Sequence, residues 1–454
     1  MYSILLNFRN EITRQGLVKD MKQIGVGLLG FGTVGAGVVK GLQERRELLA
    51  QKIGADIVLR RIADLDIKSD RGVTVDPAIL TTEASEVIND PAVDVVVELI
   101  GGTGIAKTLV MEALRAGKSV VTANKKLLAE YGEEIFTLAE ESEVDIYFGA
   151  SVGGGIPIVR VLREGLVGNA IVSMYGILNG TCNYILTRME NEGLPFDDVL
   201  KEAQAAGYAE SNPSLDIDGF DTAHKAVILA SLAYGFHVPM SVAAVEGIRG
   251  LAGIDVKFAS ELGFKIKLLA IIRGEGDEVE VRVSPTLVAV DHVLASVSGV
   301  FNAVMVKGDY TGDTLYYGRG AGRKPTASTV IGDICDIARN MIAGGPRHSR
   351  GIVRLPSEPP RMRSVSESRS RYYLRLMVLD RAGSLGRFTT ILGSHGVSIQ
   401  AVSQKCGAEV TDSDYQPVVA LTHVAREADI EAALAEIRAS GVIGGEPVKI
   451  RILD

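Results

Sequence analysis

Residues 24–35 read IGVGLLGFGTVG, an apolar run that ends in three closely spaced glycines. The run from Ile24 to Leu29 predicts a buried strand, and the residues that follow, to about Gln51, predict a helix. Glycines at 30 and 32 permit a tight turn and a close approach of the backbone to a pyrophosphate, while Gly35 lets the helix pack on the strand. In this strand–turn–helix context the glycines favour a dinucleotide-binding unit over a structural turn. The residues expected to contact the cofactor are Gly30, Phe31, Gly32, Thr33, Val34 and Gly35.

The expected second strand, Ile57 to Ala63, ends in an acidic segment that bears on cofactor choice. A carboxylate at this position can bind the ribose hydroxyls of NAD and repels the 2′-phosphate of NADP. We expect Asp64 to fill that role, with Asp66 as the alternative or as a solvated loop acid. Three basic residues nearby in the sequence leave NADP open as well: Arg60, Arg61 and Lys68.

Two further expected strands end in polar segments. The first, Val93 to Ile100, runs into a glycine-rich turn, and the second, Ser119 to Thr122, is followed by two lysines. Ligands of parallel α/β sheets bind outside the carboxyl ends of the strands. We therefore expect Gly102, Thr103 and Lys125 to lie where the nicotinamide and the substrate meet.

The composition describes a soluble α/β protein of about three domains. The chain has 454 residues, of which 46% are hydrophobic and 23% charged, and its net charge of −8 argues against general affinity for nucleic acid. The three cysteines are far apart and give no sign of a disulfide framework or a thiolate zinc site. No apolar run approaches the roughly 20 residues that span a bilayer, and residues 1–20 lack the features of a signal peptide. We expect a cytoplasmic protein with no membrane partner.

Changes in pattern along the chain suggest domain limits. After an N-terminal extension (1–20), we expect a Rossmann-type nucleotide-binding domain (21–150), an α/β catalytic and dimerisation domain with a mixed sheet (151–320), and a helix returning to the first domain (321–345). A Pro-, Ser- and Arg-rich linker (346–371) and a C-terminal βαββαβ domain (372–454) follow.

Residues 207–225, GYAESNPSLDIDGFDTAHK, gather four acids and a lysine around a turn and the start of an apolar-rich helix, Phe220 to Tyr234. Asp221 and Lys225 are four residues apart and share one helix face. The acids suit a substrate ammonium, and the lysine suits proton exchange with a hydroxyl or carbonyl. A solvated capping loop with one structural ion pair would have the same pattern, so the residues alone leave both interpretations open.

This stretch resembles the signature of homoserine dehydrogenases, over Ala203, the Gly207 turn, Asn212-Pro213, Asp216-Ile217, Gly219, Asp221 and Lys225. The resemblance implies an NAD(P)-dependent enzyme that interconverts L-homoserine and L-aspartate 4-semialdehyde in threonine, methionine and isoleucine biosynthesis. It implies Lys225 as the acid–base group and Lys125 near cofactor and substrate. It places substrate contacts at Glu210, Asp216, Asp221 and Thr181, the last in a similar segment at 177–184, and further cofactor contacts at Gly207 and Gly320.

The resemblance also concerns a glycine-rich hinge at residues 151–157. In the family a Na⁺- or K⁺-like ion binds at this hinge, where a glutamate precedes the glycines. Here Gly149 stands at the position of that glutamate. Backbone carbonyls of Val152, Gly154 and Ile156 remain as ligands, so the resemblance implies a weakened cation site.

The C-terminal segment resembles an ACT domain through the turn that contains Asp380, Gly383 and Leu385. The resemblance implies feedback by L-threonine and assembly as a homodimer or homotetramer. A small dimerisation module without a ligand is the alternative for this domain. For the whole chain the alternatives are a related amino-acid dehydrogenase with another substrate, or a non-catalytic amino-acid sensor. A sensor would have no need for a proton-transfer lysine, so the presence of both Lys125 and Lys225 counts against that alternative.

Overall fold

The computed structural model describes residues 21–344, 358–404 and 414–453. These residues form two compact units. The first contains the described residues up to Ala170 together with Val227–Met240 and those of Tyr316–Pro359. The second contains Ile171–Ala226, Ser241–Leu315 and the described residues from Pro360 onwards. Each unit is described by itself below.

The first unit is built on a six-stranded parallel sheet with the strand order β3-β2-β1-β4-β5-β6. Apolar residues of the central strands are fully buried, as expected for a parallel sheet covered on both faces. The strands are β1 (Gln23–Leu29), β2 (Asp56–Ala63), β3 (Leu80–Thr81), β4 (Val95–Glu98), β5 (Ser119–Thr122) and β6 (Ile146–Tyr147).

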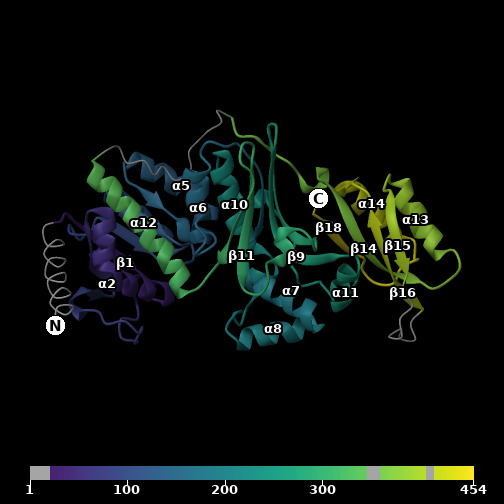
Figure 1. Ribbon diagram of the computed structural model, residues 1–454, viewed down its shortest axis with the longest axis horizontal. Coiled ribbons are helices and arrows are strands. Elements are labelled where there is room, and N and C mark those ends of the chain that lie inside the picture. Colours follow the sequence, from purple (N-terminus) through teal and green to yellow (C-terminus); the bar gives the residue numbers. More distant parts are fainter. Residues whose placement is uncertain (1–20, 345–357, 405–413, 454) are drawn as a thin grey trace, which may run out of the picture. The chain divides into compact units, whose positions relative to one another are not determined.

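Helices cover both faces of this sheet. One face packs against α2 and α12, which lie side by side (Figure 1), and the other packs against α3, α4 and α5. This arrangement confirms the Rossmann-type fold predicted from the glycine turn. The helices are α2 (Thr33–Ile53), α3 (Ala84–Ile88), α4 (Ile105–Arg115), α5 (Lys125–Glu141), the short α6 (Ile158–Arg160) and α12 (Arg323–Ala343).

The second unit contains a mixed sheet in which β11, β7, β9, β10, β18, β14, β16 and β15 follow one another. Its strands are β7 (Ile171–Ile177), β8 (Ala244–Val245), β9 (Phe264–Glu275), β10 (Glu278–Ala289), β11 (Phe301–Gly308), β13 (Arg361–Met362), β14 (Arg369–Leu379), β15 (Ile399–Gln404), β16 (Tyr415–Thr422), β17 (Ala425–Arg426) and β18 (Val448–Ile452); β12 (Gly312–Arg319) begins here. Its helices are α7 (Gly180–Glu192), α8 (Phe196–Ala205), α9 (Ser214–Ile217), α10 (Phe220–Tyr234), which continues into the first unit, α11 (Gly253–Glu261), α13 (Ser384–Ser394) and α14 (Glu427–Ala439).

The C-terminal part of this sheet has the predicted βαββαβ order, β14-α13-β15-β16-α14-β18, with the two-residue β17 added before α14. Helices α13 and α14 are neighbours, and their apolar faces form one core with the strands (Figure 1). The last strand, β18, pairs in parallel with β10, Thr286 opposite Arg451. The ACT-like sheet and the preceding sheet are therefore continuous.

Two expectations about local structure were wrong. The sequence from Gly165 to Leu178 predicts a single strand, but the observed strand β7 begins only at Ile171, because Val161–Gly165 still form a helical turn. The second half of the predicted linker is built into the unit, since β13 pairs with β10 and Arg361 and Arg363 form ion pairs with Glu278. The arginines of the predicted linker therefore include residues that form ion pairs with the sheet as well as solvent-exposed ones. Residues 1–20 and 345–357 lie outside the described residues.

Candidate active site

Two of the four acids of residues 207–225, Asp216 and Asp221, meet Lys225 in the second unit, whereas Asp218 pairs with Arg249. The Lys225 ammonium donates to Asp221 Oδ2 and to the backbone carbonyl of Leu178, each at 2.7 Å. The Asn179 side-chain amide donates to Asp221 Oδ2 at 2.8 Å and to Asp216 Oδ1 at 2.7 Å. One amide thus ties two carboxylates together next to a lysine.

Local structure explains why the amide of Asn179 faces the acids. Asn179 is the N-cap of α7, and its side-chain oxygen accepts from the backbone N–H of Cys182 at 2.8 Å. Because the oxygen is used by the helix, the NH₂ group must point the other way. Sequence reasoning missed Asn179 as a functional residue, although an asparagine directly before a helix is a recognisable capping signal.

Burial distinguishes the lysine–acid pair from a surface ion pair. Lys225 and Asp221 expose only 9% and 6% of their surface, and both lie on α10 as predicted. Burying two charges costs free energy unless they are paired and hydrogen-bonded, and sites with such pairs are often functional. The buried pair favours the catalytic interpretation over a solvated capping loop.

Cys182 lies within the same cluster, and its thiol donates to the backbone carbonyl of Asp216 at 3.2 Å. Burial, followed by the nearby carboxylates, raises the pKa of this thiol well above its usual range. A thiol held in its neutral form is a poor nucleophile. We assign Cys182 a packing role.

Three further predicted contacts lie on or against the loop after α8: the cofactor contact Gly207 and the substrate contact Glu210 on the loop itself, and the substrate contact Thr181 on α7. Gly207 has φ = 75° and ends this helix, a conformation that favours glycine. Thr181 donates its hydroxyl to the carbonyl of Tyr208 at 2.7 Å, so it fixes the loop. Gln204 donates to the carbonyl of Glu210, whose side chain is exposed.

The glycine turn of the first unit has the shape that a dinucleotide needs. Gly30 has φ = 99°, and a Cβ on Gly35 would lie 2.2 Å from the carbonyl oxygen of Gly30. A Cβ on Gly32 would meet no atom within 4 Å, so the turn is open on that side. Helix α2 has no side-chain cap and no acid in its first turn, which leaves its N-terminal N–H groups to an anion. The turn at 30–35 therefore fits a pyrophosphate.

Asp64 follows β2 and supports this turn directly. Its Oδ2 accepts from the backbone N–H of Phe31 at 2.5 Å, and its Oδ1 accepts from the N–H of Asp66 at 2.8 Å. Arg71 pairs with Asp66 at 2.9 Å and lies 4.0 Å from Asp64. Arg71 is therefore the basic residue next to Asp64 and Asp66. It is not one of the three basic residues, Arg60, Arg61 and Lys68, that the sequence suggested for NADP.

We expect Asp64→Ala to weaken NAD binding more than NADP binding, because the ribose hydroxyls of NAD would lose a carboxylate partner, whereas the 2′-phosphate of NADP would lose a repelling charge. Both affinities should fall somewhat, since Phe31 also loses its acceptor. KM values for the two cofactors measure the effect, and Asp66→Ala tests the alternative acid in the same way. Equal losses for both cofactors would contradict the assignment.

A buried acid, Glu98 at the end of β4, holds the other predicted cofactor turn. Its Oε1 accepts from the backbone N–H groups of Ile100 and Gly101, and its Oε2 accepts from the Thr122 hydroxyl at 2.6 Å. Asn124 donates to the carbonyl of Gly102 at 2.7 Å and caps α5. These contacts fix the turn that contains Gly102 and Thr103. Lys125, the first residue of α5, belongs to this unit, whereas Lys225 belongs to the second.

The glycine hinge is fastened to α12 by side chains. Asp333 accepts from the backbone N–H of Gly149 at 2.8 Å, and Thr329 donates to the carbonyl of Gly154 at 2.6 Å. The carbonyl of Ile156, another expected cation ligand, accepts from the N–H of Ile158 at 2.8 Å. A Cβ on Gly154 would lie 2.4 Å from the carbonyl oxygen of Gly320, so the hinge and that glycine turn pack closely. Two of the three proposed carbonyl ligands are already hydrogen-bonded.

Gly149 leaves room for the carboxylate of Asp333. A Cβ at position 149 would lie 2.9 Å from Asp333 Oδ1, so a glutamate there would crowd this acid. The residues present fit a monovalent cation poorly. Within the described ranges no group of three or more His, Cys, Asp or Glu side chains could hold a metal ion. Gly149→Glu, which would restore the family residue, is therefore expected to need the removal of Asp333.

Burial raises the pKa of Asp333 to about 7, although the N–H of Gly149 and the nearby Arg160 and Arg163 oppose the rise. A raised pKa favours the neutral acid in the folded protein, so its stabilising contribution is full below about pH 4 and is lost as pH rises through 7. Asp333→Asn keeps the acceptor for Gly149 without the ionisation. We expect it to flatten the pH dependence of unfolding between pH 4 and 8, by up to about 4 kcal/mol. Urea midpoints across this range test the prediction; an unchanged slope would contradict it.

Comparisons with known proteins cover nearly the whole chain. Residues 157–335 match the family model described as homoserine dehydrogenase, residues 30–149 match its NAD-binding domain, and residues 372–441 match the ACT domain. A homoserine dehydrogenase of Neisseria gonorrhoeae is 45% identical over 92% of this chain and 96% of its own length. The corresponding values for Pseudomonas aeruginosa are 42%, 95% and 99%.

Solved structures show the same likeness. A homoserine dehydrogenase from Thiobacillus denitrificans superposes with a TM-score of 0.88 at 43% identity, covering 96% of this chain and 99% of that one. A hyperthermophilic archaeal homoserine dehydrogenase in complex with NADPH has a TM-score of 0.60 at 27% identity, over 72% and 99%.

The glycine turn, the buried lysine–acid cluster and the ACT domain define a nicotinamide-dependent oxidoreductase with a C-terminal regulatory domain. The identity to curated relatives over nearly their full length goes further. This chain belongs to the homoserine dehydrogenase family. Among the described residues, none of the helices has the length and apolar character needed to cross a membrane.

Proposed function

We propose that the cluster of Asn179, Asp216, Asp221 and Lys225 is where L-homoserine is bound and its proton moved. The observation that carries the proposal is the buried Lys225 ammonium, 2.7 Å from Asp221 and 2.7 Å from the Leu178 carbonyl. These two contacts fix two of the three ammonium hydrogens. The remaining hydrogen is assigned to the substrate oxygen.

The nicotinamide cofactor, when bound, supplies the hydride acceptor for the alcohol and the hydride donor for the aldehyde. In the reductive direction Lys225 donates a proton to the aldehyde oxygen, and in the oxidative direction its neutral form accepts the hydroxyl proton. Asp216 and Asp221, both hydrogen-bonded to the Asn179 amide, attract the substrate ammonium, with Glu210 as a further carboxylate. The assignment puts Lys125 beside the cofactor.

Cofactor choice is assigned to the Asp64–Arg71 pair beside the glycine turn. Asp64 favours NAD through the ribose hydroxyls, whereas Arg71 suits a 2′-phosphate, so we propose that both cofactors are used. Reduction of NAD and of NADP on addition of L-homoserine, with other amino alcohols in parallel, tests cofactor and substrate together. Turnover of another amino alcohol in preference to homoserine would overturn the substrate assignment.

For the ACT domain we propose feedback by L-threonine in a homodimer or homotetramer. An effector shifts activity only if it binds two states with different affinity, and typical coupling gives about 5–150-fold effects. A threonine titration of activity on the full chain tests this. Removing everything after Ser357 would also strip β18 and β13 from β10, so loss of response in that truncation would not isolate the effector site. Loss of response with intact activity in Arg387→Ala, an exposed α13 residue, would support an ACT site.

A further inference from the structure

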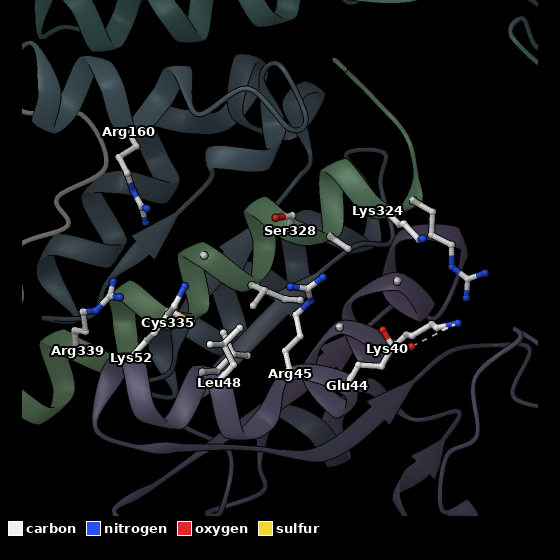
Figure 2. Close-up of a pocket in the computed structure, with 17 residues that line it drawn as sticks. Lys40, Glu44, Arg45, Leu48, Lys52, Arg160, Lys324, Ser328, Cys335 and Arg339 are labelled. Carbon is white, nitrogen blue, oxygen red and sulfur yellow. Dashed lines mark ion pairs between the residues drawn. The ribbon is translucent and has the colours of Figure 1, made fainter. Parts of the chain in front are cut away.

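A groove of about 550 Å³ runs along the outer side of the first unit, between α2 and α12 (Figure 2). The two helices approach closely because α2 has glycines at the contact. A Cβ on Gly37 would lie 2.9 Å from the Arg323 carbonyl oxygen, and one on Gly41 would lie 2.5 Å from the Ile331 side chain. The floor is apolar and is formed by Leu48, Leu49, Ala327, Ile331 and Cys335.

The rim of the groove is strongly basic. Its cationic lining residues are Lys40, Arg45, Lys52, Arg160, Arg323, Lys324 and Arg339. Among the described residues that line it, Glu44 is the one acid, and it pairs with Lys40 at 3.7 Å. Such a concentration of positive charge is unexpected in a chain whose net charge is −8.

Intramolecular pairing accounts for only some of these charges. Arg160 and Arg339 share the carboxylate of Asp336, and Arg160 also pairs with Glu164 at 3.9 Å. Arg323 donates to the backbone carbonyl of Arg71 at 2.6 Å. The exposed side chains of Arg45, Lys52 and Lys324 make no hydrogen bond or ion pair within the part of the chain that the structure describes.

The start of α12 adds to the positive potential. Arg323 and Lys324 are the first two residues of this 21-residue helix, and its first turn contains no acid. The N-terminus of a helix carries partial positive charge, so cations there are unfavourable unless an anion offsets them. Two cations at this end oppose helix stability, and a bound anion would relieve that repulsion.

We propose that this groove binds a small phosphorylated anion, of pyrophosphate to nucleotide size. Its volume lies within the range of small-ligand sites, and arginine and lysine are the side chains that bind phosphate oxygens. The apolar floor favours a ligand that carries an apolar or aromatic part beside its phosphates. The net charge of −8 argues against a polynucleotide as the occupant.

The groove is distinct from the glycine turn that holds the dinucleotide. Its lining on α2 runs from Gly37 to Lys52, one turn or more beyond Gly32. Arg323 also borders a shallower hollow next to Gly32 and Thr33. A test must therefore separate the groove from the cofactor site.

The decisive variant is Arg45→Ala combined with Lys52→Ala, because both residues are exposed and lie outside the lysine–acid cluster and the glycine turn. Arg115→Ala, an exposed arginine at the end of α4, is the matched control. Calorimetric titration with inorganic pyrophosphate and with ATP, without magnesium and in the presence of saturating NADP, should show saturable binding to the wild-type enzyme. The double variant should bind at least about tenfold more weakly, and the control should match wild type, with homoserine turnover unchanged in both.

Several results would overturn the proposal. The first is the absence of saturable binding. The second is a loss of affinity in the Arg115→Ala control equal to that in the double variant. The third is binding that NADP abolishes in wild type and double variant alike, which would assign the anion to the cofactor site. Duplex DNA that binds as tightly as ATP would also overturn it, because the surface would then recognise a polymer backbone. Lys324→Ala provides a second variant if the double substitution unfolds the protein, and thermal unfolding of each variant establishes that it is folded.

Discussion

Turnover in Lys225→Met is expected to fall by ~10²–10⁴-fold, the usual contribution of a general acid–base group, while cofactor binding stays near wild type. Methionine has a similar length and fits an apolar site, but it cannot donate to Asp221 or to the Leu178 carbonyl. The loss should appear in kcat in both reaction directions, because the same proton moves in each. Steady-state kinetics together with fluorescence titration of the reduced cofactor separate chemistry from binding.

Two further variants control for the burial of this lysine. Lys201→Met, on the exposed face of α8, removes a lysine of the same unit whose side chain is 75% exposed and should leave kcat unchanged. Asp221→Asn keeps a hydrogen-bond acceptor for Lys225 but removes the charge, so kcat should fall less than in Lys225→Met. Near-wild-type turnover in Lys225→Met, with the protein folded, would remove this residue from the mechanism.

The second large effect concerns stability. Arg451 on β18 is almost fully buried and forms bidentate contacts with Glu427, at 2.6 and 2.8 Å, and with Glu246, at 2.8 and 3.0 Å. Arg451→Met removes one partner of a buried ion pair and leaves the Glu427 carboxylate with Lys449 and the hydroxyl of Tyr372. Breaking a buried pair in this way typically destabilises a protein by about 3–5 kcal/mol.

The effect should depend on pH. Burial alone would raise the pKa of Glu427, but Arg451 and Lys449 outweigh it and hold the pKa below its usual value. A lowered pKa in the folded state gives stability that is present at neutral pH and lost as pH falls below the unfolded value of 4.5. The difference between Arg451→Met and wild type should therefore shrink in acid. Urea unfolding at pH 7 and pH 4 measures it.

Arg438→Met is the matched control, because Arg438 pairs at the surface with Glu446, which is 81% exposed. Exposed pairs contribute about 0–1 kcal/mol, so this variant should unfold close to wild type. A similar small change in Arg451→Met would mean that the buried network does not hold the ACT-like sheet in place.

Sequence reasoning found the parts of this protein that local pattern determines. The glycine turn at 30–35 requires particular backbone angles, and α10 has a long apolar face, so both were predictable with their limits. Partners that come from distant segments were not. Glu98 reads as a strand acid and Asn179 as a helix cap. Only folding brings Glu98 to the Thr122 hydroxyl and Asn179 to the carboxylates of Asp216 and Asp221.

The hinge and the predicted linker also have partners that are distant in the sequence and could not be predicted from it. Gly149 indicated a missing cation ligand, but nothing nearby in the sequence indicated that Asp333, on a helix 184 residues later, uses the space. The composition of residues 346–371 predicted a linker, whereas Arg361 and Arg363 form ion pairs with acids on the hairpin of β9 and β10. Assignments that rest on resemblance, including Lys125 beside the cofactor, remain predictions.

The pairing of β10 with β18 also has a consequence during synthesis. Thr286 and its partner Arg451 are separated by 165 residues, the difference between their numbers. At about 5–20 residues per second, a ribosome needs roughly 8–33 s to make that stretch, during which one edge of β10 has no β18 to bind. Unpaired strand edges are the usual templates for aggregation. The nascent chain is therefore expected to depend on chaperones most strongly in this interval, and a ribosome stalled near residue 345 should yield a more aggregation-prone product than the finished protein.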